Sequence, residues 1–198
     1  MTSRREFLHG ATLAAVPLVT GLPETADAMQ GTVLAYQAVL IDDRYAESRS
    51  FGARLAARGA ALRVLPQGDV TSLWLQEIGP AWRRAPIPVA GLTRPSALFC
   101  LEQLAWSQGL RVVFHAEHVV AASRPVDHVV QSCTGSGANL EADDLSRHGL
   151  LWPMQVADAI AEFGATSSAD RAGPSCAGLL PALPPDAELL TSWIIAPA

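Results

Sequence analysis

Two adjacent carboxylates, Asp42 and Asp43, directly follow the first long apolar run of the chain, residues 33–41. Paired carboxylates can ligate a metal ion, and their mutual repulsion can raise one pKa far enough for general-base catalysis. Asp43 could equally cap the next helix, because a short acidic side chain accepts hydrogen bonds from free backbone N–H groups. The catalytic and the capping interpretation of this pair both stay open at this point.

A second group of chemically capable side chains comprises His115, Glu117 and His118. Two imidazoles and a carboxylate within four residues suit zinc or copper, which makes the two histidines candidate metal ligands and Glu117 a candidate ligand-binding residue. On an extended strand, residues three apart point to opposite faces. Both histidines can therefore hold one ion only if the strand ends near His115 and the chain turns there.

Cys133 precedes a glycine-rich segment, residues 134–137, and a predicted helix. Backbone N–H groups in such a loop can receive an anion, and a thiol there could be a catalytic nucleophile activated by His115 or His118. The outline is similar to the loops of cysteine phosphatases and rhodaneses, but the arginine that grips the anion in those loops is missing here. The alternative is a buried Cys133, or a disulfide between Cys133 and Cys176.

Arginine supplies all 14 cations of the chain, and there is no lysine. This composition excludes a Schiff-base lysine, a pyridoxal-phosphate anchor and a P-loop lysine. Thr93, Arg94 and Ser96 stand at the start of a predicted helix, where Arg94 and the helix N-terminus could bind a carboxylate or phosphate. A plain helix start with a solvated Arg94 is the alternative. Arg44 is the other candidate for binding an anion.

The elements that must position these side chains alternate along the chain. Continuous apolar runs predict buried strands at residues 33–41, 60–65, 86–92, 110–116 and 126–133. Helices are predicted at residues 45–58, 70–82, 96–108 and 142–163. Strands spaced by helices in this way favour a three-layer α/β sandwich with a mostly parallel sheet, similar to Rossmann or flavodoxin-like folds. Residues 188–195 could add a last strand at an antiparallel edge.

Ligands of an open parallel sheet bind beyond the carboxyl ends of its strands. The candidate residues described above follow the first, third, fourth and fifth predicted strands. The sequence therefore predicts that they face one crevice at that edge of the sheet.

The first 28 residues carry a separate signal. Residues 3–9 read SRREFLH, a weakly apolar stretch follows, and the small-residue sequence Ala-Asp-Ala ends at Ala28. This segment resembles the twin-arginine (Tat) signal peptide, whose consensus is Ser/Thr-Arg-Arg-x-Phe-Leu-Lys, with His9 where lysine is usual. The resemblance implies export of the folded chain to the periplasm by the Tat translocase, cleavage after Ala28 and no stable membrane span afterwards. The expected organisation is a signal peptide at 1–28, an α/β domain at 29–164, and a loop-rich segment at 165–198 whose last strand packs on that domain.

The net charge and the absence of known motifs limit the classes of function that the sequence allows. A net charge of −5 and a pI near 5.5 argue against nucleic-acid binding. No dinucleotide, haem or serine-hydrolase motif occurs, so the sequence identifies no cofactor. The resemblance implies cargo that carries a cofactor, folds too fast, or travels with a folded partner that carries a cofactor. We therefore expect an accessory or small-ligand-binding subunit of a periplasmic system, a redox system included, with a cofactor-bearing protein as partner. The alternative is a periplasmic enzyme with hydrolytic or metal-assisted chemistry at the carboxyl edge of the sheet.

Overall fold

A computed structural model describes residues 36–122, 124–132, 140–165 and 183–197. The predicted signal peptide, Cys133 and Cys176 lie outside these residues. The strands are β1 (Ala38–Ile41), β2 (Leu62–Val64), β3 (Val89–Thr93), β4 (Leu110–Ala121), β5 (Arg124–Ser132) and β6 (Ala187–Pro197). The helices are α1 (Ala46–Ala56), α2 (Thr71–Leu73), α3 (Gly79–Arg84), α4 (Pro95–Trp106), α5 (Ala142–Arg147) and α6 (Trp152–Ala165). Two 3-10 helices, η1 (Pro66–Gly68) and η3 (Gly149–Leu151), and a π-helical segment, η2 (Trp74–Ile78), complete the described helices.

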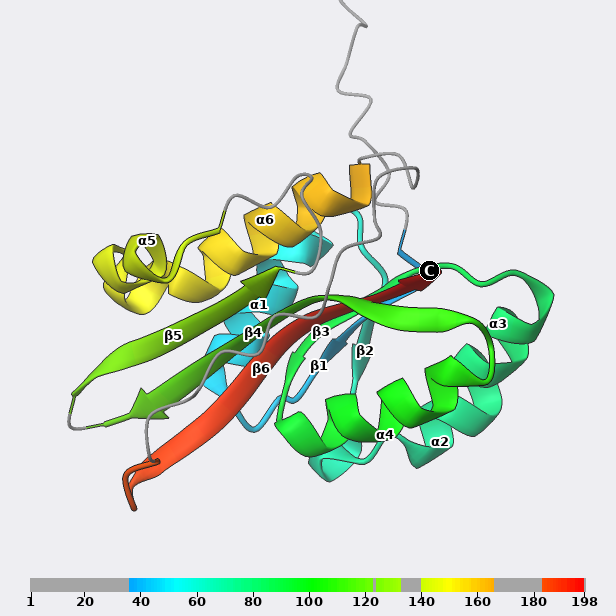
Figure 1. Cartoon of the computed structure of the whole chain (residues 1–198), viewed down its shortest axis with the longest axis horizontal. Helices are drawn as coiled ribbons and strands as arrows, with labels where there is room; N and C mark the ends of the chain where they lie inside the picture. The colour runs from blue at the N-terminus through cyan, green and yellow to red at the C-terminus, as the bar shows by residue number, and fades with distance from the viewer. Residues whose placement is uncertain (1–35, 123, 133–139, 166–182, 198) are drawn as a thin grey trace, which may run out of the picture. The chain divides into compact units, whose positions relative to one another are not determined.

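The fold is α/β, with a mixed sheet of six strands in the order β2-β1-β3-β6-β4-β5 (Figure 1). Strands β1, β2 and β3 pair in parallel, whereas β6 is antiparallel to both β3 and β4, and β5 is antiparallel to β4. The prediction of a mostly parallel sheet is therefore wrong beyond the first two pairings. The short link from Ala121 to Arg124 accounts for the β4–β5 pair, because a tight hairpin joins antiparallel neighbours and a parallel pair needs a long crossover. The other two antiparallel pairs arise because β6 is inserted between β3 and β4.

Strand β6 is antiparallel, as predicted, but it lies at the centre of the sheet rather than at an edge. It pairs with β3 from Thr191 to Ile195 and with β4 along its whole length. Residues 190–196 are all buried. A strand covered on both faces and bonded on both sides can be apolar throughout, which explains the continuous run Trp193-Ile194-Ile195.

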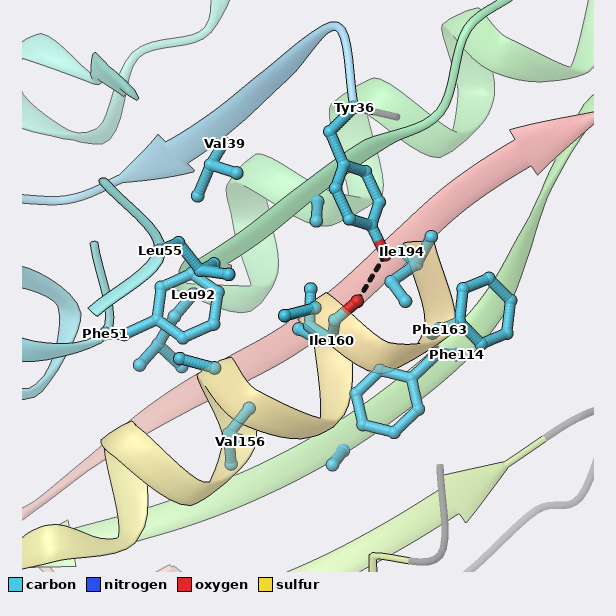
Figure 2. Close-up of a cluster of buried hydrophobic side chains, with 14 of the residues drawn as sticks. Tyr36, Val39, Phe51, Leu55, Leu92, Phe114, Val156, Ile160, Phe163 and Ile194 are labelled. Carbon is cyan, nitrogen blue, oxygen red and sulfur yellow. Dashed lines mark hydrogen bonds between the residues drawn. The ribbon is translucent and has the colours of Figure 1, made fainter. Parts of the chain in front are cut away.

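The helices form a layer on each face of the sheet (Figure 1). Helices α1 and α6 cover one face, where Phe51 and Leu55 of α1 pack with Ile160 of α6 and Ile194 of β6 (Figure 2). The hydroxyl of Tyr36 donates a hydrogen bond of 2.8 Å to the carbonyl of Ile160 in the same cluster. Buried aromatic and aliphatic side chains therefore join the two helices of this layer to the central strand.

Helices α2, α3 and α4 cover the other face. Trp193 of β6 packs there with Leu98 and Leu101 of α4. Its ring lies over Gly91 of β3, where an added Cβ would come within 2.6 Å of Trp193 Cζ2. The position requires glycine because only a backbone without a side chain admits the indole so closely. None of the described helices combines the length and the hydropathy that a membrane span requires.

Candidate functional site

The carboxyl end of β1 carries an ion pair whose two side chains bond each other. Asp42 is fully buried, and both of its carboxylate oxygens accept hydrogen bonds from Arg44, at 2.8 Å from Nε and 2.5 Å from Nη2. The hydrogen bond to Asp42 is the main cause of the raised pKa of Arg44. Gly68 of η1 covers the pair, because a Cβ there would lie 2.5 Å from Arg44 Nη2. The Asp42–Arg44 pair thus lies where the turns after β1 and β2 meet.

Asp43 neither joins that pair nor caps the next helix. Its side chain is exposed, and its backbone carbonyl accepts a hydrogen bond from Arg49. Tyr45 occupies the N-cap position of α1, and no side-chain hydrogen bond caps that helix. The capping interpretation is therefore wrong, and the two carboxylates do not share a site.

The polar residues after β3 are also engaged with neighbours. Thr93 is buried, accepts a hydrogen bond of 3.0 Å from Trp193 Nε1 and donates one of 3.1 Å to the carbonyl of Arg94. Arg94 lies 3.2 Å from a carboxylate oxygen of Glu188. Ser96 lies on α4 and lines an apolar groove on the face of the sheet that α2, α3 and α4 cover. Both arginines predicted to bind an anion at this edge are therefore already paired with carboxylates.

The predicted metal site is not formed. Strand β4 does not end near His115 but continues to Ala121, so His115 and His118 point to opposite faces of the sheet. His115 and Glu117 share one face, with Nε2 and Oε1 4.0 Å apart. In the part of the chain that the structure describes, no group of three histidine, cysteine, aspartate or glutamate side chains could hold a metal ion.

A buried hydrogen-bonded chain that we did not predict runs across β5, β4 and β6 on the α6 side of the sheet. His118 Nδ1 lies 2.8 Å from His128 Nδ1, and His118 Nε2 lies 2.8 Å from Ser192 Oγ. The ring of Trp152, the first residue of α6, lies over His118 with ring centroids 4.2 Å apart. The two histidines face each other because His118 and His128 are paired in the β4–β5 hairpin. A regular hairpin around residues 122–123 would set His118 opposite Asp127. The bulge between Val119 and Ala121 shifts the register by one residue and brings His118 opposite His128, and no local sequence signal predicts that bulge.

Burial keeps both histidines neutral. It lowers the pKa of His118 well below the ordinary value of 6.5, and the neighbouring His128 lowers it further. Burial likewise lowers the pKa of His128 to about 4, although Asp127 opposes the shift. A hydrogen bond between the two Nδ1 atoms requires one ring to donate and the other to accept, so the two rings hold linked tautomers.

These three side chains are hydrogen-bonded in the order found around an activated serine, but the serine is not accessible to a substrate. A nucleophilic serine next to a histidine, itself oriented by a third group, is the arrangement of hydrolytic triads. Such a site also needs room for a substrate and hydrogen-bond donors for the oxyanion. Ser192 is fully buried in the central strand β6. In this conformation the three side chains orient one another and do not meet a substrate.

His128, one end of this hydrogen-bonded chain of side chains, also lines a cavity of about 620 Å³, which we call the hairpin cavity. It lies between the β4–β5 hairpin, α5, η3 and the start of α6. Most of its wall is apolar, including Val126, Leu145 and Trp152, and Arg124 and His128 are among its few polar residues. Leu145 and Trp152 are themselves part of the core beneath α6. The cavity therefore combines an apolar floor that is part of the core with a small number of hydrogen-bonding groups.

A second hollow, the α4 groove, has a volume of about 510 Å³ and lies where η2 meets α4. Trp74, Leu75, Phe99 and Leu104 are among the side chains that line it. Leu75 and Phe99 are 66% and 62% exposed, so two large apolar side chains of the same hollow face solvent. Cys100, also in the groove, is exposed and has a free thiol.

The neutral histidine pair predicts acid-sensitive stability. The unfolded chain binds a proton at each histidine near pH 6.5, whereas folded His128 does so only near pH 4. The unfolded state therefore binds more protons in between, and stability falls as the pH is lowered. We expect a loss of about 2 kcal/mol from His128 alone between about pH 7 and about pH 5, measured by urea unfolding.

A matched variant tests the assignment to this histidine. His148→Ala removes an exposed histidine that bonds only a backbone carbonyl, and it should keep the full acid sensitivity. His128→Leu should reduce that sensitivity. An unchanged dependence on pH in the His128→Leu variant would contradict the assignment.

Comparisons of the chain with known protein families, with curated proteins and with solved structures give no match.

Proposed function

We propose that this protein is exported to the periplasm by the Tat translocase and acts there as a small-ligand-binding or accessory subunit. The hairpin cavity is the observation that carries the ligand-binding role. Its volume of about 620 Å³ falls within the range of small-molecule sites, and its mostly apolar wall with a few fixed polar groups is typical of them. The exported location is supported by residues 3–9 and by the small-residue sequence that ends at Ala28.

The accessory role has its own support in the α4 groove. Large side chains such as Leu75 and Phe99 are exposed together there, and exposed apolar surface of this kind is common where proteins associate. A cofactor-bearing periplasmic partner is the protein that we propose to dock at this groove.

We propose a Rossmann-like relationship for one part of the sheet only. That part is strands β1 to β3, whose order is β2-β1-β3 and whose helices cover both faces.

A cavity-filling substitution tests the ligand-binding role. Ser146 of α5 lines the hairpin cavity, is exposed and bonds the carbonyl of Ala142, so Ser146→Trp should fill the cavity without disturbing the core. We expect this variant to lose at least about ten-fold in affinity for anilinonaphthalene sulfonate, a fluorescent apolar probe, because the bulky ring occupies the site. The measurement is a fluorescence titration.

The control for this experiment is Ser50→Trp. Ser50 of α1 makes the same bond to the carbonyl four residues earlier and does not line the cavity. It should retain the probe affinity of the unchanged protein. Equal binding by the two variants would contradict a binding site in the hairpin cavity.

A hydrolytic enzyme is the second candidate, favoured by the hydrogen-bonded chain of Ser192, His118 and His128. The two functions differ in whether Ser192 ever becomes accessible. We expect no covalent adduct with a fluorophosphonate reagent, measured by intact-protein mass spectrometry, because Ser192 is fully buried. An adduct that disappears in the Ser192→Ala variant would favour the enzyme instead.

The export proposal is tested on the arginine pair of the N-terminal segment. Replacing Arg4 and Arg5 by lysine should abolish appearance of the protein in the periplasmic fraction, because lysine lacks the planar guanidinium of the motif. The chain offers a matched control in Arg83 and Arg84, an exposed pair at the end of α3, whose double lysine variant should still be exported. Export of the first variant at the level of the control would contradict the Tat assignment.

A further inference from the structure

One cation in the wall of the hairpin cavity has donors without a partner. Arg124 opens β5, and its Nη1 lies 2.8 Å from Asp127 Oδ2. Its Nε and Nη2 are buried and have no hydrogen-bond partner among the residues that the structure describes. Arg124 lines the cavity, whereas Asp127 does not. The ion pair therefore uses one part of the guanidinium and leaves the other two nitrogens unpaired.

Unpaired buried donors on a permanent cation are unfavourable, because the guanidinium does not lose its proton to relieve them. The Nε–Nη2 edge presents two parallel N–H groups, the geometry that a carboxylate accepts with both of its oxygens. In this conformation Nε and Nη2 have almost no accessible surface, although the Arg124 side chain as a whole is 35% exposed. A planar acceptor with two adjacent oxygens would bind them once this side chain rotates toward the cavity, and would complete what Asp127 leaves open.

The rest of the cavity limits the charge and shape of such a ligand. Val126, Leu145 and Trp152 form apolar walls that suit an aliphatic or aromatic body. The carboxylate of Glu47 also lines the cavity, and Asp127 already offsets part of the charge on Arg124. A dianionic phosphate would lie near the Glu47 carboxylate, with a single arginine, already partly neutralised by Asp127, to balance its two charges. A head group with one negative charge fits better.

We infer that the hairpin cavity binds an amphiphilic monocarboxylic acid, whose carboxylate accepts hydrogen bonds from Nε and Nη2 of Arg124 and whose apolar body packs against Leu145 and Trp152. This inference rests on the proposed ligand-binding function and names the class of ligand. His128 lies in the same wall and offers the body of the ligand one further hydrogen-bonding group.

The experiment compares three probes with one apolar body: phenylbutyrate, the uncharged amide phenylbutyramide and the phosphate monoester phenylpropyl phosphate. Affinities for the full chain are measured by isothermal titration calorimetry. We expect the acid to bind at least about ten-fold more tightly than either of the others, which corresponds to about 1.4 kcal/mol. Arg124→Gln should remove this preference and leave the affinity for the amide unchanged.

Arg147→Gln is the matched control. Arg147 forms an ion pair with Asp144 at the same sequence separation as Arg124 and Asp127, but it does not line the cavity. It should leave all three affinities unchanged. A second variant, Asp127→Asn, keeps Arg124 and removes the competing carboxylate, so it should raise the affinity for the acid several-fold and not that for the amide. This variant decides the question if Arg124→Gln fails to fold.

The outcomes separate the two proposals. Equal affinities for the acid and the amide overturn the monocarboxylate inference and leave the ligand-binding function standing. Tighter binding of the phosphate monoester overturns the inference in favour of a dianionic ligand. Absence of binding by all three probes, in a protein that unfolds cooperatively, overturns both the inference and the ligand-binding function.

Discussion

The structure depends on the insertion of one buried strand, β6, between β3 and β4. On one side of β6 lies the parallel unit of β1, β2 and β3, and on the other lies the β4–β5 hairpin. These two parts share no strand pairing of their own, so their common sheet exists only through the hydrogen bonds of β6. The apolar side chains of β6 also reach both helical layers, since successive residues point to opposite faces.

The same strand positions the polar groups on either face. Ser192 bonds His118 on the α6 side, and Trp193 bonds Thr93 on the α4 side. Adjacent residues of β6 thus fix the neutral histidine pair beside the hairpin cavity and the buried turn into α4. A cavity wall that includes His128 inherits this rigidity, because a histidine held by a buried partner does not have to be ordered again when a ligand binds.

The sequence was informative where local pattern decides the structure and misleading where distant pairing does. The predicted helices at residues 45–58 and 96–108 match α1 and α4 closely, because apolar spacing and end signals act over a few residues. The position of β6 in the sheet depends on pairs of residues that lie far apart in the chain, such as Val112 and Ile195, and no local pattern encodes it. The candidate site failed for a related reason. Charges such as Arg94 and Glu188 proved to be one another's partners, whereas Arg124 and His128 gave no motif at all.

The position of β6 has a consequence for the order in which the molecule can assemble. β6 follows every other described strand in the sequence, yet it occupies the middle of the sheet. During synthesis the ribosome releases β1 to β5 first, and the inner edges of β3 and β4 then stay open until the last strand arrives. The sheet can therefore be completed only after β6 has been synthesised, and in the meantime two open edges are exposed to unwanted strand pairing, a hazard that chaperones limit.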